Sequence, residues 1–150
     1  PAPAKPDPSS PHGSARIFEA LQSLPAGLKK AKHAAPLDLA PAAGAFITKS
    51  MSNGAGKRDY KLYIPSVASR SPHEPRPLII MLHGCTQSAD DFAAGTRMNF
   101  AAEGNGCFVA YPEQIAAANT SKCWNWFETK HQSRGRGEPS LIAGIAEQIM

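Results

Sequence analysis

Residues 78–82 read Leu-Ile-Ile-Met-Leu, an unbroken apolar run that follows Pro77 and stops just before Gly84. A run of this length that is closed by a glycine is typical of a β-strand covered on both faces. Residues 107–111, Cys-Phe-Val-Ala-Tyr, form a second apolar run, which ends at Pro112. The two runs predict two buried strands of one sheet with a layer on each of its faces.

The segment between these strands carries the signals of a helix. Ser88 is a good N-cap residue, and Asp90 and Asp91 place negative charge in the first turn, where it is favourable against the helix dipole. We expect the helix to extend to about Glu103, with a break near residues 95–96. Strand, helix and strand at this spacing predict a βαβ unit, and therefore a parallel sheet with a right-handed crossover in an α/β fold.

An antiparallel hairpin is expected ahead of this unit. Residues 45–51 and 58–64 flank a turn at 52–56, whose Asn53–Gly54 pair tolerates the positive φ that a hairpin connection needs. The second run alternates apolar and mostly polar residues, so one face of the hairpin should be buried. Residues 65–77 are rich in proline and are expected to form a connector.

The composition changes near residue 44. Eight of the 14 prolines fall within the first 41 residues, and we predict that residues 1–43 form a disordered linker or arm, with a transient helix over 15–24. Residues 1–50 also carry six cations and three anions, so most of the net charge of +4 lies there. The basic residues of 29–33 are best explained as a solvated charge run, and we predict no nucleic-acid partner.

The last part of the chain contains a long loop and a helix. The loop, residues 113–137, holds both tryptophans of the chain, and loops of this length in a compact domain are usually functional. Glu138 and Pro139 then begin an amphipathic helix. We expect residues 44–150 to be the N-terminal half of a larger α/β domain. No apolar run approaches the roughly 20 residues that a membrane-spanning helix needs.

Several sequence blocks occur in a characteristic succession. The run from Pro77 leads into HGCTQSADDF, which is followed by GTRMN, FVAYPEQ, CWNWF and RGRGEPSLIAGI. Over roughly residues 45–150 this succession closely resembles the poly(3-hydroxybutyrate) depolymerase-type esterases. These are secreted α/β-hydrolases that include short-chain polyester depolymerases and feruloyl and acetylxylan esterases. The resemblance implies an α/β-hydrolase that begins with an antiparallel hairpin and βαβ units.

The resemblance also implies an activity, that of a serine carboxylesterase of the polyhydroxyalkanoate or short-chain polyester depolymerase type, located extracellularly or in the periplasm. Feruloyl or acetyl esters of plant polysaccharide are the alternative substrates. The nucleophile elbow, Gly-x-Ser-x-Gly, and the Asp and His of the family do not occur here, so the chain is expected to be truncated before the elbow and inactive alone. The alternative is a non-catalytic fragment or binding module. The oligomeric state stays open.

The residues after the first strand suit an oxyanion hole, the set of N–H donors that stabilises the tetrahedral intermediate of ester hydrolysis. Gly84 admits unusual backbone angles and close approach, which lets the Cys85 N–H face the cleft, and the resemblance assigns the Cys85 amide this role. Gly84 and Thr86 are candidate substrate contacts. The plainer interpretation is that the His-Gly pair only turns the chain from strand to helix.

The histidines and acidic pairs have simpler explanations than catalysis. The usual chain order in this fold is Ser, Asp, His, so His83 is expected to be structural, and the same argument applies to His131. Asp90 and Asp91 are explained by their place in the first helical turn. No histidine has metal-ligand spacing with a cysteine, and we predict no metal and no cofactor.

Three cysteines cannot all pair. Cys85 and Cys123 lie in loops expected at the carboxyl end of the sheet, so a disulfide between them is sterically reasonable, although sequence alone does not fix it. Cys107 is expected to pack as a small reduced thiol. A thiol nucleophile at Cys85 is the sharper alternative, but no partner base is evident.

The aromatic segment of the long loop is the remaining candidate. One of Trp124 and Trp126 is expected to anchor the loop and the other to line the acyl or alcohol cleft, because aromatic faces suit polyester and phenolic surfaces. Sequence does not decide which. Arg134 and Arg136 lie beside Glu138 and are expected to form ion pairs within a solvated loop.

Overall fold

A computed structural model describes residues 37–150 of the chain. The predicted arm of residues 1–43 therefore lies mostly outside the described residues, as do the helix expected over 15–24 and the basic run of 29–33. Of the arm, residues 37–43 are described. There Asp38 pairs with Arg97 at 3.4 Å, and the Leu39 carbonyl accepts a hydrogen bond from the Asn99 side chain at 2.7 Å.

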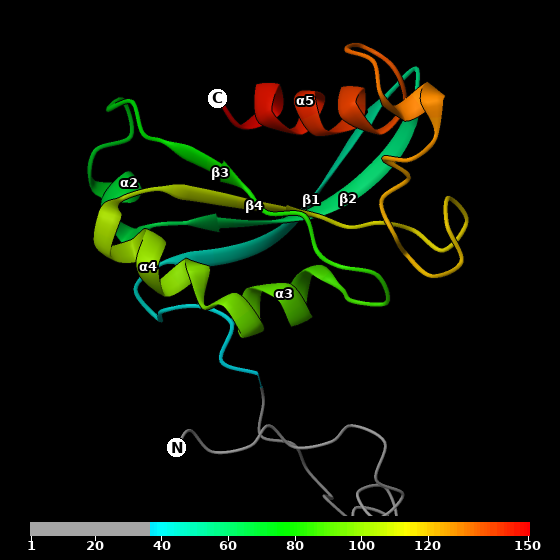
Figure 1. The fold of residues 1–150 in the computed structure, drawn as a ribbon. Helices are drawn as coiled ribbons and strands as arrows, with labels where there is room; N and C mark the ends of the chain where they lie inside the picture. Colours follow the sequence, from blue (N-terminus) through cyan, green and yellow to red (C-terminus); the bar gives the residue numbers. More distant parts are fainter. Residues whose placement is uncertain (1–36) are drawn as a thin grey trace, which may run out of the picture. The chain divides into compact units, whose positions relative to one another are not determined.

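The strands form one mixed sheet (Figure 1). They are β1 (Ala45–Asn53), β2 (Gly56–Ile64), β3 (Leu78–Ile80) and β4 (Phe108–Pro112), in the order β1-β2-β4-β3. The pairs β1–β2 and β2–β4 are antiparallel, and β3 runs parallel to β4. The sheet confirms the predicted hairpin, the parallel pair and the α/β class.

Helices cover both faces of this sheet (Figure 1). The helices are α2 (Ser66–Arg70), α3 (Ala89–Thr96), α4 (Met98–Asn105) and α5 (Gly137–Ile149), and a 3-10 turn, η2, covers Thr129–His131. α3 and α4 lie against one face, and α5 lies across the other. The short helix α2 falls in the segment expected to be a connector. None of the helices among residues 37–150 is long and apolar enough to cross a membrane.

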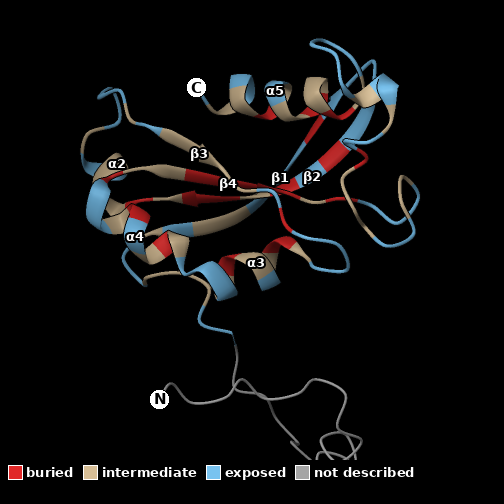
Figure 2. Cartoon of the chain, in the orientation of Figure 1, coloured by how far each residue is buried: buried red, intermediate tan, exposed pale blue. Residues whose placement is uncertain are grey.

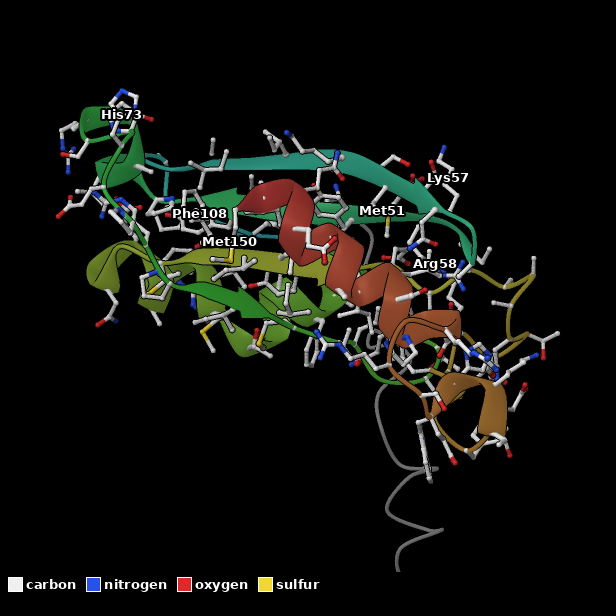
Figure 3. All side chains as sticks on the ribbon, turned by 90° about the horizontal axis from the view of Figure 1, so that it is seen from above. Met51, Lys57, Arg58, His73, Phe108 and Met150 are labelled. Atoms are coloured by element: carbon white, nitrogen blue, oxygen red, sulfur yellow. A yellow bond between two sulfur atoms is a disulfide. The ribbon has the colours of Figure 1, made fainter. Side chains whose placement is uncertain are left out.

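Each face of the sheet has its own hydrophobic core, visible as the buried residues on either side of the strands (Figure 2). Under α5 the buried residues are Met51, Tyr60, Leu62, Ala110, Leu141 and Ile145. Under α3 and α4 they are Tyr63, Ala89, Ala93, Ala102, Val109 and Tyr111. Seen from the α5 side, Met51 lies beside the helix and Phe108 lies near its C-terminal end, and both belong to this core (Figure 3). The amphipathic pattern predicted for residues 138–149 is confirmed by the burial of Leu141 and Ile145.

Burial of the strands differs from the sequence expectation in two places. β2 was expected to have one buried face, yet Tyr63, on its opposite face, is fully buried under α4. The run of residues 78–82 was expected to be buried on both faces, yet all three residues of β3 are only half-buried and Leu82 is 40% exposed. The reason is lateral position, because β2 lies between two strands and β3 lies at the edge of the sheet.

Local turn chemistry explains how the elements begin and end. Ser88 caps α3 with a capping box, in which its side chain accepts from the Asp91 N–H and the Asp91 carboxylate accepts from the Ser88 N–H. The break between α3 and α4 falls at Arg97, whose φ is +53°, just after the predicted position. In the hairpin turn the positive φ belongs to Gly56 instead of the Asn53–Gly54 pair, and Asn53 accepts from the Ala55 N–H.

Candidate active-site region

The loop after β3 contains three consecutive backbone N–H groups that differ in their hydrogen bonding. The Gly84 N–H donates to the Gln87 side chain at 2.8 Å, and the Thr86 N–H donates to the Ser121 carbonyl at 2.7 Å. Between them, the N–H of Cys85 donates no hydrogen bond to any of residues 37–150, and the residue is exposed. The fold thus leaves one amide of this loop available to an external acceptor.

The backbone of this loop is unusual at Thr86, and Gly84 is needed for a different reason. Thr86 has a φ of +65°, a conformation that is rare for a β-branched residue and is often found at functional sites. Gly84 does not have a positive φ, but a Cβ there would lie 2.9 Å from the Gln87 side-chain oxygen. A side chain at this position would therefore displace the Gln87 amide that accepts from the Gly84 N–H.

A disulfide joins this loop to the tryptophan loop. The bond links Cys85 and Cys123, with an S–S distance of 2.02 Å and a Cα–Cα distance of 4.2 Å. The hydrogen bond from Thr86 to Ser121 runs beside it, so a covalent and a polar link hold the two loops together. Cys107 is a free, half-buried cysteine just before β4.

His83 is buried and structurally engaged. Only 2% of its surface is exposed, and its Nε2 accepts from the Gln114 N–H at 3.0 Å. The ring proton therefore lies on Nδ1, which donates to the Gly84 carbonyl at 2.8 Å. His131 is also engaged by backbone, since its Nδ1 accepts from the Glu138 N–H at 2.9 Å. Both rings link segments of backbone, as a structural histidine does.

The two tryptophans occupy different environments. Trp124 is half-buried, with its ring centroid 5.8 Å from that of His83. Trp126 is 74% exposed and Phe127 is 55% exposed, and their rings meet edge to face at 5.9 Å. Trp124 thus anchors the loop against the residue that precedes the Cys85 turn, and Trp126 and Phe127 present an aromatic surface to solvent.

Behind the loops lies a group of buried polar side chains: Gln114, Asn125 and Glu138, which we call the Gln114 cluster. Glu138 was expected to pair with Arg134 and Arg136 in a solvated loop, and this is wrong. It is only 3% exposed, and no ion pair joins it to either arginine. Its carboxylate instead accepts hydrogen bonds from Gln114 and Asn125, because it begins α5 at the buried end of the loop.

A second carboxylate ties the tryptophan loop to α3. Glu113 accepts from the Ala89 N–H at 2.6 Å, at the N-terminus of α3, and lies 3.3 Å from the Lys122 ammonium. Lys122 itself has a φ of +53° and precedes the disulfide cysteine. The helix that follows the Cys85 loop and the loop that carries Cys123 are therefore joined by one residue after β4.

Sequence reasoning placed Gly84, Cys85, Thr86, Cys123, Trp124 and Trp126 in one region, and the structure brings the loops that contain them together. It missed the Gln114 cluster. The available signal was weak. Gln114 lies two residues after β4, and Glu138 lies in the first turn of α5. Neither position alone indicates burial.

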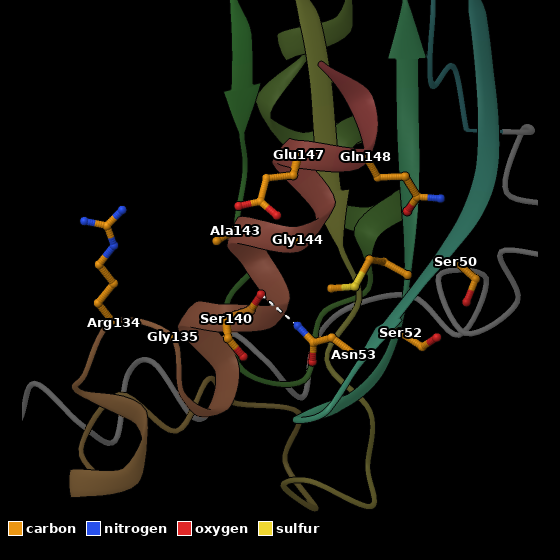
Figure 4. A pocket seen from close by; sticks show the side chains of 11 residues that line it. Ser50, Ser52, Asn53, Arg134, Gly135, Ser140, Ala143, Gly144, Glu147 and Gln148 are labelled. Carbon is orange, nitrogen blue, oxygen red and sulfur yellow. Dashed lines mark hydrogen bonds between the residues drawn. The ribbon is translucent and has the colours of Figure 1, made fainter.

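A separate cavity of about 690 Å³ lies between β1 and α5 (Figure 4). Ser50, Asn53 and Glu147 are among its lining residues, and the Asn53 side chain donates to the Ser140 carbonyl across it at 3.1 Å. None of the lining residues comes from the Cys85 loop or from residues 119–127. Within residues 37–150, no group of His, Cys, Asp and Glu could hold a metal ion.

Comparison with known proteins gives the following matches. The family profile described as Esterase PHB depolymerase matches residues 58–149. Poly(3-hydroxyalkanoate) depolymerase C of Paucimonas lemoignei is 39% identical over 75 residues, 49% of this chain and 17% of its own length. Feruloyl esterase B of Neurospora crassa is 30% identical over 103 residues, 69% of this chain and 32% of its own.

Among solved structures, the S-formylglutathione hydrolase of Staphylococcus aureus aligns with a TM-score of 0.49 and 13% identity, over 71% of this chain and 40% of that protein. The chain spans at most about a third of the length of the two curated relatives named above, which are 17% and 32% covered.

Proposed function

The chain belongs to the PHB depolymerase esterase family, and from this premise we propose that it supplies one N–H of the oxyanion hole of a serine carboxylesterase. The α/β-hydrolase fold of the family agrees with the observed mixed sheet, in which helices cover both faces. In this fold the loop after an early strand offers one backbone donor to the reacting carbonyl. The Cys85 loop follows β3, which supports assigning it this role.

In the proposed reaction the chain contributes one hydrogen-bond donor and not the nucleophile. A serine hydroxyl attacks the ester carbonyl as a general base takes its proton, and the carbonyl oxygen becomes an oxyanion. The Cys85 N–H donates a hydrogen bond to that oxygen, and the amide after the nucleophile gives the second. No Gly-x-Ser-x-Gly sequence occurs among the 150 residues. The nucleophile, its base and the acid are proposed to come from the remainder of a longer protein.

One observation carries this proposal: the Cys85 N–H has no acceptor among residues 37–150, while the amides on both sides of it donate within the protein. An oxyanion hole needs a donor that is held in place before the reaction and that no internal acceptor occupies. The disulfide and the Thr86–Ser121 hydrogen bond both tie the Cys85 backbone to the tryptophan loop. The donor is therefore both available and fixed.

A polyester is the substrate that we propose first. The paired rings of Trp126 and Phe127 give an exposed aromatic surface on the segment that the disulfide ties to the Cys85 loop, suited to the apolar repeat of a poly(3-hydroxyalkanoate). Gly84 and Thr86 would contact the ester group, and Trp124 would form the wall behind it. The depolymerase of Paucimonas lemoignei, at 39% identity, supports this choice.

A feruloyl ester is the second candidate substrate. The feruloyl esterase B of Neurospora crassa matches a longer part of this chain, 69%, than the depolymerase does. A phenolic acyl group would also stack against Trp126. Kinetics with methyl ferulate and with p-nitrophenyl butyrate separate the two candidates. A feruloyl esterase is expected to show the higher kcat/KM with methyl ferulate, and a depolymerase is expected to show it with the butyrate ester. Acetyl esters of plant polysaccharide are tested in the same assay.

We propose an extracellular or periplasmic location. The disulfide between Cys85 and Cys123 is the supporting observation, because such bonds form and persist in oxidising compartments. No cofactor and no metal enter the proposed mechanism, which needs only side chains and backbone amides.

The decisive experiment separates the Cys85 backbone from its side chain in a version of the protein that includes the nucleophile segment. Cys85→Ala and Cys85→Pro both remove the disulfide, but only proline removes the N–H. We expect Cys85→Ala to retain kcat within a modest factor, and Cys85→Pro to lower it about a hundredfold or more.

Equal turnover of the two variants would contradict the oxyanion role. Abolished turnover in a folded Cys85→Ala protein would also contradict it, because the side chain or its disulfide would then be required in addition to the amide. A protein that includes the nucleophile segment and hydrolyses none of these esters would instead identify the chain as part of a non-catalytic binding module.

A further inference from the structure

The Gln114 cluster lies where the two functional loops have their bases. Gln114 is fully buried, and Asn125 and Glu138 are each 3% exposed. Gln114 follows β4, Asn125 lies between the two tryptophans, and Glu138 is in the first turn of α5. Three segments that are distant in sequence therefore meet through buried polar side chains, which is costly unless every polar group is paired.

Glu138 satisfies this requirement through the aromatic segment. One carboxylate oxygen accepts from the Asn125 N–H at 2.7 Å. The other accepts from the side chains of Asn125 at 2.8 Å and of Gln114 at 2.5 Å. Two of these three hydrogen bonds come from Asn125, so the carboxylate fixes both the backbone and the side chain of the residue between Trp124 and Trp126.

Gln114 extends the same cluster to both loops. Its backbone N–H donates to His83, which in turn donates to the Gly84 carbonyl beside Cys85. Its side-chain amide donates to the Cys123 carbonyl at 3.0 Å. The two ends of the disulfide are thus each reached from Gln114 by a separate polar contact.

A buried cation, Arg58, is attracted to the Glu138 carboxylate. Arg58 is only 7% exposed and donates to the Gln114 side-chain oxygen at 3.1 Å. Burial lowers the pKa of Arg58, and attraction to the Glu138 carboxylate acts in the opposite direction. Arg58 lies near the end of α5 at which Glu138 stands (Figure 3). A buried network that is fully paired specifies one arrangement of its members.

We propose that Glu138, acting through Gln114 and Asn125, is a positioning residue that holds the Cys85 loop and the segment 123–127 in one fixed arrangement. For its effect on turnover, this inference rests on the proposed function. Glu138 does not contact the substrate. Its carboxylate sets where Trp124 and Trp126 stand relative to the Cys85 amide, and a displacement of about 1 Å in such a site can cost up to a hundredfold in rate.

The test uses Glu138→Gln, which keeps the shape of the side chain and replaces one acceptor oxygen with a donor NH₂. Three N–H groups point at this carboxylate, so the amide must face at least one of them donor to donor. The matched control is Glu147→Gln, the same substitution at an exposed position on the same helix. Both variants are made in the version of the protein that includes the nucleophile segment.

Loop order is measured first, because it does not depend on catalysis. We expect hydrogen–deuterium exchange of peptides covering residues 119–128 to become at least about tenfold faster in Glu138→Gln, with β2 and β4 unchanged. We also expect dithiothreitol to reduce the Cys85–Cys123 disulfide several times faster. Glu147→Gln should match the unsubstituted protein in both measurements. Unchanged exchange and reduction in folded Glu138→Gln would overturn the proposal.

Kinetics then test the consequence for the reaction. With p-nitrophenyl butyrate we expect kcat of Glu138→Gln to fall about tenfold or more and KM to change less than about threefold. An equal fall of kcat in Glu147→Gln would contradict a specific role. If no version hydrolyses the ester, the proposed function fails, and the exchange and reduction measurements still decide the positioning role.

A milder variant keeps the test decisive if Glu138→Gln does not fold. Asn125→Ala retains the backbone hydrogen bond to Glu138. It removes the side-chain hydrogen bond to Glu138, together with those to the Ala118 carbonyl and from the Asn119 side chain. We expect the same changes in exchange and reduction at about a third of their size. Faster exchange throughout the domain, instead of in residues 119–128, would show a general loss of stability and overturn the inference.

Discussion

The two ends of the sheet each contain a glutamate that accepts three hydrogen bonds, and the two are used differently. At one end, Glu103 of α4 accepts from the Tyr63 hydroxyl at 2.5 Å and from the backbone N–H and the hydroxyl of Ser66. At the other end, Glu138 of α5 accepts from Gln114 and Asn125. Glu103 is half-buried, and Glu138 is 3% exposed.

The difference lies in what each carboxylate holds. Glu103 links a helix, a strand and the start of α2, all of which are also supported by regular secondary structure. Glu138 links α5 to loops that have little regular structure of their own. The same hydrogen-bonding chemistry therefore stabilises the scaffold at one end and orders the loops of the candidate site at the other.

The largest effect is expected from the disulfide, which only the Glu138 end possesses. Removing it by Cys123→Ala should lower the free energy of unfolding by about 2 to 4 kcal/mol, because the bond closes a loop of 38 residues. Cys85→Ala should cost the same, and the double variant should cost no more than either. Chemical denaturation of the three variants measures this, and unequal, additive losses would argue against the bond.

The scaffold end is tested by Glu103→Gln. It should lower the free energy of unfolding by about 1 to 2 kcal/mol, since charged hydrogen bonds from Tyr63 and Ser66 are weakened. Exchange of residues 119–128 and the rate of disulfide reduction should stay as in the unsubstituted protein. If Glu103→Gln speeds exchange in those residues as Glu138→Gln does, then the proposal that Glu103 stabilises the scaffold and only Glu138 orders the loops is wrong.

The pH dependence of stability sharpens the same point. Hydrogen bonds from Ser66 and Tyr63 lower the pKa of Glu103 below its ordinary value of 4.5. A carboxylate with a lowered pKa stabilises the fold above its unfolded-state pKa and loses that contribution as the pH falls through the folded-state pKa. Melts between pH 6 and pH 3 should therefore show a smaller loss of stability in Glu103→Gln than in the unsubstituted protein. A parallel loss would contradict the assignment.

The smallest stability change is expected at Trp126. Because its side chain is 74% exposed, Trp126→Ala should alter the free energy of unfolding by less than about 0.5 kcal/mol. Trp124→Ala removes a half-buried ring that packs on His83 and should cost more. If the proposed substrate contact is correct, Trp126→Ala raises KM for a polyester substrate at unchanged melting temperature. An equal loss of stability in both variants would contradict the anchor and surface roles.

Short-range signals predicted much of this architecture. The Ser88 cap with Asp91, the hairpin with its turn at 52–56 and the amphipathic helix from Glu138 all depend on residues within one or two turns of each other. The sequence also indicated that Cys85 and Cys123 lie at the same end of the sheet, since both follow strands that run in parallel. These features follow from local backbone geometry and the direction of the chain.

The burial of the polar side chains in the Gln114 cluster could not be predicted from short-range signals. Glu138 beside Arg134 and Arg136 indicated surface ion pairs, and only the fold shows that α5 begins under the tryptophan loop, where Asn125 replaces the arginines as partner. Burial of a carboxylate depends on segments that meet in space, and the donors it needs come from residues 13 and 24 positions away.

The burial of the strands shows what the sequence pattern could not predict. The succession of apolar and polar residues along the chain was enough to predict the hairpin, the crossover and the α/β class. It did not determine the lateral order β1-β2-β4-β3, which places β2 inside the sheet under α4 and β3 at its edge. Tyr63 is buried and Leu82 exposed for that reason. Alternation records which side of a strand a residue takes, whereas burial also depends on the neighbours that tertiary packing places there.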